Sequence, residues 1–454
     1  MKKQLLSFLL LLSFVVSLSA QKAQVASDVE ANLRKHVEYL ASDRLEGRRA
    51  GEPGATYAAG YIANQFAKLR LKPGIASKGT LNFLQAFSYT PVRDPHATPA
   101  EPTAANAANA KVGYNVIGIL EGHDAVLKNE AIVIGAHYDH LGRGGHGSLA
   151  ANSTEIHHGA DDNASGTAAI IELARQFAKD KSNKRTLIFI AFSGEEDGLF
   201  GSKYYVNNPV FPVDKTVAMI NLDMVGRLNE HKLTIGGVGT ASEWKTLVEA
   251  RNKTVYGNPE TAYGIIGGSS NFTGAFRTFA LQLNEDGFGP SDHSSFYGKQ
   301  VPVLFFFTGT HLDYHKPSDT FERINYVGAA QIVAFVAAIT KTVDENPTRP
   351  TYTVAKAPAN TGARIGFSIS LGTIPTYADS TDGMLLDGVR ENSPASKAGL
   401  KAGDKVVKLA GKDIKNVMDY TAVMGEMKPD VEYDVVIIRG GETLTLKIVP
   451  AKRP

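Results

Sequence analysis

The chain has 454 residues, enough for two or three domains, and its 48 lysines and arginines nearly balance 46 aspartates and glutamates. This balance leaves no basic field that would hold a polyanion, so the composition argues against nucleic acid as a partner. The absence of cysteine excludes disulfide bonds and a lipid-modified N-terminal cysteine, and it restricts any zinc site to histidine and carboxylate ligands.

The first 20 residues have the pattern of a secretory signal peptide. Lys2 and Lys3 precede an apolar run from Leu5 to Leu18, and small residues follow at Ser19 and Ala20. The run is too short and wrongly flanked for a stable membrane span, so we expect no membrane contact after cleavage. The expected location of the protein is the periplasm or the extracellular space.

The segments that follow alternate between helical and strand patterns. Residues from Val25 to about Leu40 place apolar side chains on one helical face, and a second helix is predicted from Ala55 to Leu69. Asp94 to Ala110 offers almost nothing to bury, which predicts a solvent-exposed excursion. Val112 to Leu120 then opens a sheet.

Four further apolar runs of strand length each lead to residues that can bind a metal. They are Ala131–Ala136 before His137 and Asp139, Thr186–Phe192 before Glu195 and Glu196, Val217–Leu222 before Asp223, and Val301–Phe307 before His315. Continuous apolar runs that alternate with helical patterns predict an α/β fold with a mostly parallel, doubly wound sheet. Ligands of such sheets bind beyond the carboxyl ends of the strands, so we expect these side chains to converge.

The stretch from His157 to Arg175 is the element around which the other strand ends are arranged. Its second half has the apolar spacing of a helix, and Asp162 and Asn163 lie near the start of that helix. Carboxylates at this position are common helix caps, so the stretch alone leaves a capping role and a metal-binding role open for Asp162.

The candidate residues suit zinc. Two histidines and three or more carboxylates form a typical donor set, and one shared carboxylate would hold two ions ~3.5–4 Å apart. Such a pair can acidify a water, polarise a carbonyl and stabilise an oxyanion. One member of the Glu195–Glu196 pair can ligate while the other acts as a general base. Asp139 is placed to accept the second ring proton of His137.

Six sequence blocks occur in an order that resembles a known family. The blocks HYDHLG, GADDNASG, FSGEEDGLFGS, NLDMVGR, SDHSSF and YHKPSDT resemble the secreted di-zinc aminopeptidases related to aminopeptidase Y and bacterial leucyl aminopeptidase. The resemblance extends from about Val29 to Ile339 and implies the zinc exopeptidase fold. The protease-associated insert of some relatives is absent, because only the excursion after Asp94 occupies that region.

The resemblance also implies a role for each matching residue. His137 and Asp223 resemble the terminal ligands of one zinc ion, and Glu196 and His315 resemble those of the other. Asp162 resembles the bridging ligand. The resemblance further implies Glu195 as the general base and Asp139 as the carboxylate behind the first histidine. No cofactor other than two zinc ions is expected.

The C-terminal part of the chain predicts a second domain. Asp344 to Gly362 carries three prolines and no periodic pattern, which predicts a linker between a zinc aminopeptidase domain at 21–343 and a β-rich domain at 363–454. Gly388 to Ile414 resembles the corresponding stretch of a bacterial-type PDZ domain. The resemblance implies binding of an extended peptide, such as a peptide C-terminus, with its carboxylate-binding loop near Gly362–Phe367. The alternative is that this domain only packs against the rest of the protein and that its peptide groove binds nothing.

Several polar residues near the predicted site support weaker interpretations. The histidines of one loop region are interpreted as loop residues rather than ligands: His140, His146, His157 and His158. Asp292 and His293 either line a substrate pocket or close a hydrogen-bonded turn. The polar loops at His140–His157 and Thr254–Gly274 either wall a pocket or form surface excursions.

The leading functional prediction is a secreted zinc exopeptidase that removes N-terminal residues from peptides with a free N-terminus. Water would be the nucleophile, and Glu195 would be its general base. One alternative is acyl transfer by a glutaminyl cyclase, since the resemblance extends to those single-zinc enzymes. Another is a non-catalytic binder with the PDZ domain as its working part. The complete set of five ligands and the Glu195–Glu196 pair favour the hydrolase.

Overall fold

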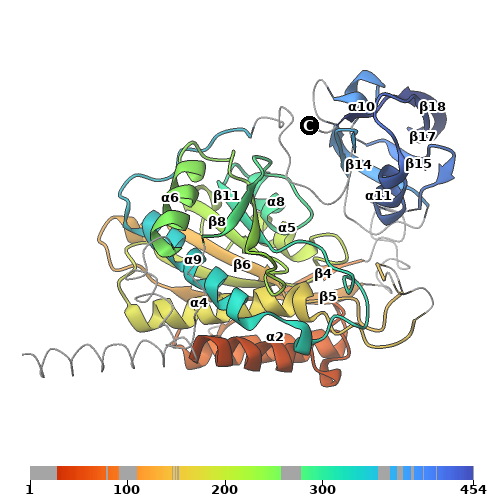
Figure 1. The fold of residues 1–454 in the computed structure, drawn as a ribbon. Coiled ribbons are helices and arrows are strands. Elements are labelled where there is room, and N and C mark those ends of the chain that lie inside the picture. Colours follow the sequence, from red (N-terminus) through yellow and green to blue (C-terminus); the bar gives the residue numbers. More distant parts are fainter. Residues whose placement is uncertain are drawn as a thin grey trace, which may run out of the picture.

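The computed structural model describes residues 28–77, 80–90, 110–145, 147–148, 150, 153–256, 278–355, 369–375, 382–389, 393–401, 403–415 and 417–452. The predicted signal peptide, nearly all of the Asp94–Ala110 excursion and most of Thr254–Gly274 lie outside these residues. The predicted carboxylate-binding loop and His146 also lie outside them. The described chain forms a large unit and a smaller C-terminal unit, each with its own hydrophobic core (Figure 1).

A mixed sheet organises the large unit. Among the described residues nine strands pair in the order β1-β5-β7-β6-β8-β11-β9-β10, with β4 paired to β5. The central strands β7, β6, β8 and β11 run parallel, whereas β1, β4 and β5 at one edge pair antiparallel, as do β9 and β11. The strands are β1 (Lys72–Pro73), β4 (Leu84–Tyr89), β5 (Lys111–Leu120), β6 (Ala131–His137), β7 (Thr186–Phe192), β8 (Thr216–Leu222), β9 (Lys232–Gly236), β10 (Ala280–Leu283) and β11 (Val303–Phe307). A separate ribbon pairs β2 (Ile75–Ser77) with β3 (Thr80–Asn82).

The predicted doubly covered α/β sheet is confirmed, with antiparallel strands at its flanks. Every residue of β6, β7 and β8 is buried, as expected for strands covered on both faces. Alternate side chains enter two different cores: Ile132 and Ile134 face one layer of helices, and Val133 faces the other.

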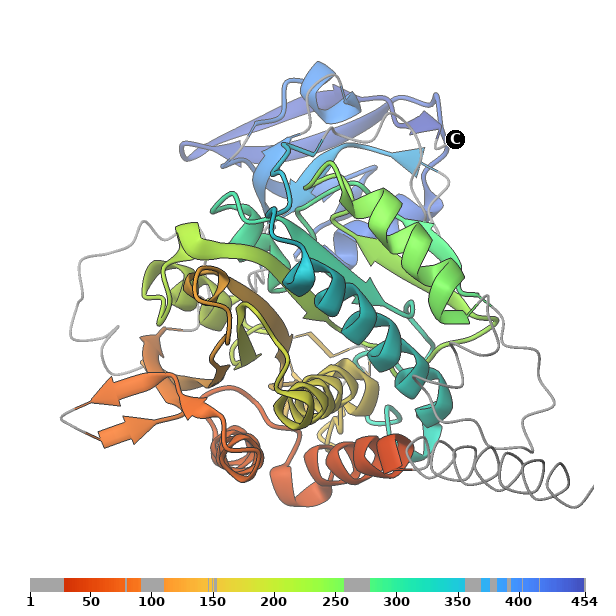
Figure 2. The ribbon, with the colours of Figure 1, turned by 90° about the vertical axis from the view of Figure 1, so that its left-hand side faces the viewer.

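Within the described part of the chain, five helices cover one face of the sheet and two cover the other. The helix of residues 28–40 and α2, α4, α6 and α9 contribute to the larger core, and they lie on the same face in Figure 2. The helices α5 and α8 contribute to the second core. The helices are α2 (Pro53–Lys68), α4 (Gly166–Asp180), α5 (Phe200–Asn207), α6 (Trp244–Tyr256), α8 (His293–Tyr297) and α9 (Tyr326–Glu345). Short 3₁₀ turns occur at Asp43–Leu45, Leu127–Asn129, Val213–Lys215 and Phe321–Arg323.

The helix α9 is long and apolar. Asn325 caps its start by accepting a hydrogen bond from the amide of Gly328 (2.9 Å). Among the described helices it is the one long and apolar enough to cross a membrane, but 67% of the relevant window is buried inside the fold. Burial of this extent is typical of a core helix, because a core helix packs its apolar surface against the rest of its own chain.

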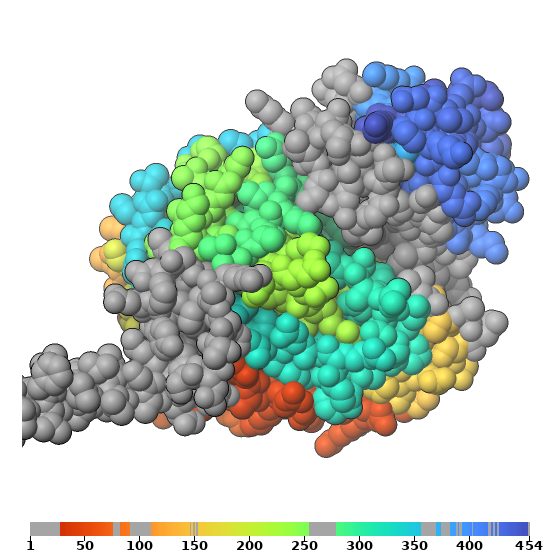
Figure 3. Space-filling view, viewed as in Figure 1, coloured from red at the N-terminus to blue at the C-terminus, as the bar shows by residue number. Residues whose placement is uncertain are grey.

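The C-terminal unit is small and β-rich, as predicted, and its described strands pair antiparallel. Its buried residues form one core that is separate from those of the large unit, and in Figure 3 its residues, in blue, form a distinct lobe. Its helix α10 (Pro394–Lys397) is capped by Ser393, whose hydroxyl accepts from the amide of Ser396. The other elements are β12 (Ile369–Ser370), β13 (Thr373–Pro375), β14 (Met384–Val389), β15 (Lys405–Leu409), β16 (Lys412–Asp413), α11 (Val417–Glu426), β17 (Tyr433–Arg439), β18 (Glu442–Ile448) and β19 (Ala451–Lys452).

The beginning of the predicted linker is attached to the large unit. The side chain of Thr351 donates to Glu243 (2.7 Å), and the amide of Ala355 donates to the hydroxyl of Tyr297 (2.9 Å). Tyr352 pairs with Ala241 as an isolated bridge and packs against the second core. Residues 346–355 therefore stabilise the large unit although their sequence has no periodic pattern.

These contacts predict different stabilities for two truncated chains. A chain ending at Ala355 should keep the melting temperature of the large unit, whereas one ending at Glu345 should melt about 3–8 °C lower. The shorter chain loses several hydrogen bonds and the burial of Tyr352, worth roughly 2–4 kcal/mol together. Thermal unfolding of both chains, followed by circular dichroism, measures the difference. Equal melting temperatures would show that the segment contributes nothing to stability.

Candidate metal centre

The five predicted ligands converge at the carboxyl ends of the parallel strands. His137 is the last residue of β6, and Asp223 directly follows β8. The turn after β7 carries Glu196, and the loop after β11 carries His315. The fifth residue, Asp162, belongs to the wide helical turn Ala160–Ser165 that leads into α4. All five are nearly or fully buried, so the predicted convergence is present in the structure.

Asp162 lies at the centre of the cluster and faces both histidines. Its Oδ1 lies 3.3 Å from Nε2 of His137, and its Oδ2 lies 3.2 Å from Nε2 of His315. Nε2 of His137 also lies 3.3 Å from Oδ1 of Asp223, and Nε2 of His315 lies 3.4 Å from Oε2 of Glu196. Each oxygen of Asp162 is thus the centre of one donor group, which is the arrangement that a bridging carboxylate requires.

The donor spacing fits zinc. With ligands ~2.0–2.1 Å from a tetrahedral zinc ion, neighbouring donor atoms lie about 3.3 Å apart. The four distances of 3.2–3.4 Å match this edge length and are longer than a typical charge-assisted hydrogen bond. The residues present therefore fit two zinc ions, one on each side of Asp162.

His140 also belongs to the cluster, although the sequence led us to interpret it as a loop residue. Its Nδ1 lies 2.7 Å from Oε1 of Glu196 and 3.8 Å from Oδ2 of Asp162. Its Nε2 is buried and has no hydrogen-bond partner among the described residues. His140, Asp162 and Glu196 can together surround one ion. The available sequence signal was the position of His140 three residues after His137, on the same strand-end loop.

The two other described histidines of this region make loop contacts. His157 pairs with the hydroxyl of Ser148 (2.8 Å) and with the carbonyl of Glu155 (3.0 Å). His158 lies 2.8 Å from Oδ1 of Asp43 and also contacts a main-chain carbonyl. Both ring nitrogens of each residue are therefore engaged away from Asp162.

Asp139 contacts a different group from the one we predicted. Nδ1 of His137 lies 3.2 Å from the main-chain carbonyl of Asp139, whereas the carboxylate oxygen lies 3.9 Å away. The carboxylate instead accepts hydrogen bonds from the amides of Glu195 (3.2 Å) and Glu196 (3.4 Å). The difference arises because the loop after β6 turns the side chain of Asp139 toward the turn after β7. Asp139 thus orients His137 through its backbone and holds the Glu195–Glu196 turn through its carboxylate.

The neighbours of Asp162 in sequence attach its turn to the end of β8. The side-chain Nδ2 of Asn163 donates to the carbonyl of Leu222 (3.0 Å), and its Oδ1 accepts from the main-chain amide of Met224 (3.2 Å). Asp161 accepts from the amide of Gly226 (2.6 Å). These bonds surround Asp223 on both sides and set its separation from Asp162.

Asp319, which the sequence did not single out, holds the main chain at Asp162 by hydrogen bonds. One of its oxygens accepts from the amides of Asp161 (2.9 Å) and Asp162 (3.1 Å), and the other lies 3.2 Å from a guanidinium nitrogen of Arg227. Asp319 stands four residues after His315 in the YHKPSDT block, so the block supplies both a donor and its support. Nδ1 of His315 meanwhile donates to the carbonyl of Gly147 (2.7 Å), which leaves Nε2 free to face Asp162.

The buried carboxylates repel one another. Two like charges about 4 Å apart at an effective dielectric constant near 20 repel by about 4 kcal/mol, equivalent to roughly three pKa units. Burial and the neighbouring Asp162 raise the pKa of Glu196 to about 8, and burial raises the pKa of Asp139 to about 6. These acids cannot all ionise at neutral pH without added positive charge, which two dications would supply.

Glu195 has the environment of a general base. Its side chain is only 11% exposed, and its Oε2 lies 4.0 Å from Nε2 of His137. Burial, together with the charges of Glu196, Asp223 and Asp292, raises the pKa of Glu195 well above its usual range, against the opposing effect of His137. A carboxylate whose pKa is raised in this way can accept and return a proton near neutral pH.

Asp292 and His293 lie at the edge of this cluster. The main chain forms a turn here, because the carbonyl of Asp292 accepts from the amide of Ser295 (3.2 Å). The side chain of Asp292 is fully buried, and burial raises its pKa to about 7. His293 stacks on Phe305 (ring centroids 4.5 Å apart). The turn that we considered is present, and its carboxylate lies close enough to influence Glu195.

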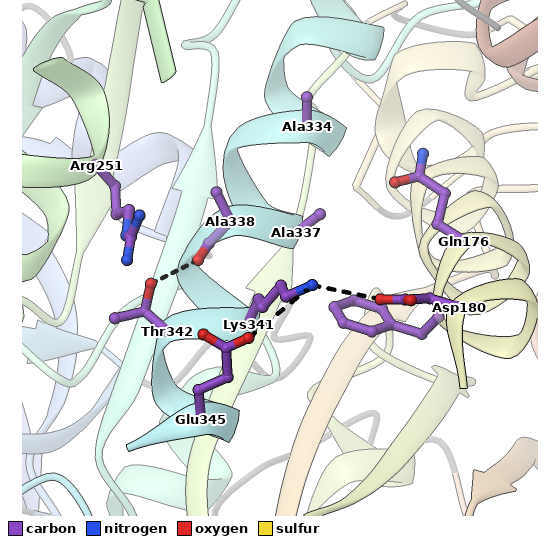
Figure 4. A pocket seen from close by; sticks show the side chains of 10 residues that line it. Gln176, Asp180, Arg251, Ala334, Ala337, Ala338, Lys341, Thr342 and Glu345 are labelled. Carbon is purple, nitrogen blue, oxygen red and sulfur yellow. Dashed lines mark hydrogen bonds and ion pairs between the residues drawn. The ribbon is translucent and has the colours of Figure 1, made fainter. Parts of the chain in front are cut away.

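A separate hollow of about 410 Å³ lies at the other end of the sheet, between α4, α6 and α9 (Figure 4). Lys341 points into it and pairs with Asp180 (3.4 Å) and Glu345 (4.0 Å). None of the residues that line it is a predicted site residue. Lys341 thus pairs with both acids of the lining, and the hollow does not compete with the metal centre as a candidate site.

Comparison with known proteins identifies both units. The family model described as "Peptidase family M28" matches residues 115–340, and the model described as "PDZ domain" matches residues 369–449. The curated relative Aminopeptidase YwaD of Bacillus subtilis is 29% identical over 223 residues, which cover 47% of this chain and 41% of the relative. The chain thus matches less than half the length of this relative.

Two solved structures share the fold. One is a Zn-dependent exopeptidase from Parabacteroides distasonis (TM-score 0.50, 16% identity), which covers 70% of this chain and 98% of its own. The other is the glutaminyl cyclase of Porphyromonas gingivalis (TM-score 0.50, 16% identity), which covers 69% of this chain and 98% of its own. At this identity the likeness establishes the fold alone, and the fold is shared by both enzyme classes.

The electrostatics predict that zinc binding at pH 7 releases protons. In the metal-free protein the acids Glu196 and Asp162 outweigh burial and raise the pKa of His315 to about 9, and the pKa of Glu196 is about 8. At pH 7 the Glu196–His315 pair therefore retains at least one proton that it must lose in order to ligate, so apparent zinc affinity should rise from pH 7 to pH 9. Calorimetric titration with zinc in two buffers of different ionisation enthalpy should count at least one proton per chain.

The matching control is the same titration near pH 10, where both groups are already deprotonated and proton release should fall. Proton release that is absent at pH 7, or that does not depend on pH, would contradict the assignment of Glu196 and His315 as ligands.

Proposed function

Since the chain belongs to peptidase family M28 through its first unit and carries a PDZ domain as its second, we propose that it is a secreted di-zinc aminopeptidase. The observation that carries this proposal is the pair of donor groups on opposite sides of Asp162. The sequence of residues 1–20 supports export to the periplasm or the extracellular space. The substrates would be peptides with a free N-terminus.

The residues divide into two metal sites with one shared ligand. His137, Asp223 and Oδ1 of Asp162 would hold one zinc ion, and His315, Glu196 and Oδ2 of Asp162 would hold the other. When bound, the two ions would polarise the scissile carbonyl, lower the pKa of a water and stabilise the developing oxyanion. His140, against Glu196, would fix the second of these sites from the side.

Glu195 would move the proton. Its raised pKa lets it accept a proton from the attacking water and return it to the leaving amine. The amide of Glu195 is held by the carboxylate of Asp139, so the base and its neighbour Glu196 keep separate directions. Burial of the cluster excludes bulk water and strengthens these interactions.

The PDZ domain would bind an extended peptide, such as a peptide C-terminus, by adding a strand to its sheet edge. The formal net charge of +2 supports the view that neither nucleic acid nor a membrane is a partner after signal cleavage.

Acyl transfer by a glutaminyl cyclase is the second candidate, because the structurally similar proteins include a glutaminyl cyclase. Donor groups on both sides of Asp162 favour two ions and hydrolysis over this single-zinc chemistry. An assay with a peptide that begins with glutamine separates the two functions, because a hydrolase frees glutamine whereas a cyclase forms a pyroglutamyl end.

We expect about two zinc ions per chain and loss of activity on aminoacyl-anilides after chelation. Because the ions bind the folded state, chelation should also lower the melting temperature of the first unit. Native mass spectrometry and thermal unfolding of the same samples test both points. A single tightly held ion in fully active protein would contradict the di-zinc proposal and favour the cyclase.

Glu195 and Glu196 should not be interchangeable. Glu195→Gln keeps the shape of the side chain but cannot accept a proton, so kcat should fall by roughly 10²–10⁴-fold with KM and zinc content nearly unchanged. Glu196→Gln removes a charged ligand and should lose zinc and activity together. Kinetics and zinc analysis on the same preparations give the answer.

The opposite pattern, with zinc lost from Glu195→Gln and kept by Glu196→Gln, would reverse the two roles. Full activity in both variants would rule out the hydrolase proposal.

A further inference from the structure

Arg48 lies behind the metal centre and connects two of its loops. Its side chain is completely buried. Nε donates to the carbonyl of Tyr138 (2.7 Å), Nη2 to that of Gly159 (2.9 Å), and Nη1 to those of His158 (2.7 Å) and Leu40. Tyr138 stands between His137 and Asp139, and Gly159 stands three residues before Asp162. One guanidinium thus joins the loop of the first histidine to the loop of the central carboxylate.

The backbone around Arg48 is constrained to make these contacts. Glu46, Gly47 and Arg48 all have φ between 47° and 72°, in the left-handed region that residues with a side chain seldom adopt. Such conformations persist only where the surrounding structure enforces them, and they concentrate at functional sites. A Cβ on Gly47 would lie 2.4 Å from the carbonyl oxygen of Gly142 and 2.6 Å from that of His157. The segment therefore passes between the two loops at the closest approach that glycine allows.

The main chain of the segment adds to the connection. The carbonyl of Arg48 accepts from the amide of His140 (3.2 Å), and the carbonyl of Gly47 accepts from the amide of Gly142 (2.9 Å). The loop after β6 is thus bonded to this segment at Tyr138, His140 and Gly142.

Arg48 also carries a buried charge. Among the described residues each hydrogen bond of its guanidinium ends on a neutral main-chain carbonyl. Burial lowers the pKa of Arg48 to about 10. The negative charges of nearby acids oppose this effect and keep the pKa from falling further; these acids are Asp139, Asp162, Asp319 and Glu196. The side chain therefore stays charged at neutral pH, and the counter-charges are the acids of the metal centre and their supports.

We propose that Arg48 is a positioning residue for the metal centre: it fixes Asp162 relative to His137 by joining the loops that carry them. This inference rests on the proposed function, because it assumes that these residues bind zinc. A planar guanidinium can reach four carbonyls in different directions, whereas the ammonium of lysine is a single point charge. Arg48→Lys should therefore keep the charge but loosen the separation of the donors.

Arg185 provides a matched control within the same sheet. It is also completely buried, and it donates to the carbonyls of Val343, Asp344, Asn346 and Pro347, with one additional carboxylate partner at Glu130. It stands at the amino end of β7, whereas the metal centre lies beyond the carboxyl ends of the strands. Arg185→Lys thus disturbs a similar carbonyl network without contact to the donors.

The experiment measures zinc affinity and melting temperature of the full-length wild type, Arg48→Lys and Arg185→Lys. Zinc affinity is measured by competition with a chelator at 25 °C, where circular dichroism shows that each protein is folded. Both substitutions should lower the melting temperature of the zinc-free protein. Only Arg48→Lys should weaken zinc binding, by tenfold or more, whereas Arg185→Lys should stay within threefold of the wild type.

A second measurement does not depend on the variants folding. If Arg48 couples the two loops to zinc, removal of zinc from the wild type should speed amide hydrogen exchange at residues 44–50, which contain no ligand. Exchange around residues 183–187, beside Arg185, should change little.

Three outcomes are distinguishable. If the wild-type protein binds no zinc, the proposed function itself is contradicted. Wild-type protein that binds two ions, with Arg48→Lys binding them equally well, would overturn the positioning role and leave the hydrolase proposal standing. Exchange at residues 44–50 that is unaffected by zinc would also overturn it.

Discussion

The structure depends on the placement of one carboxylate between two histidines. Asp162 turns one oxygen toward His137 and the other toward His315, at 3.3 and 3.2 Å. In the proposed di-zinc centre Asp162 would serve two donor groups at once, so a displacement that improves one distance worsens the other. Every loop at the carboxyl edge of the sheet must therefore be held relative to this single side chain.

The protein meets this constraint with hydrogen bonds rather than with apolar packing. Asn163 attaches the turn of Asp162 to the end of β8, and Asp319 holds the amides of the same turn. Asp139 holds the turn after β7, and Arg48 spans the loops after β6 and before α4. Directional bonds suit this task, because apolar contacts tolerate small shifts whereas metal ligands in a buried site do not.

The electrostatics and the fold contribute different parts of the functional assignment. A doubly covered sheet of this kind is shared by a zinc exopeptidase and a glutaminyl cyclase, so the architecture leaves the reaction open. The buried acids restrict the choice of reaction, because Glu195 and Glu196 both have raised pKa values and lie in different surroundings. Glu196 lies against His140 and His315, whereas Glu195 lies near His137 and within the influence of Asp292. These different surroundings are what the proposed ligand and the proposed general base require.

The sequence alone predicted the main elements of the first unit and the donor residues that converge in the structure. Apolar runs at Ala131–Ala136 and Thr186–Phe192 predicted buried strands, and the residues at their ends predicted ligands, because these signals are local. The tertiary structure decided how these residues are held. Arg48 and Asp319 were overlooked, His140 was interpreted as a loop residue although it belongs to the cluster, and the carboxylate of Asp139 was assigned the wrong contact. Their roles depend on partners such as Gly159, 111 residues from Arg48, and no local pattern encodes contacts over that separation.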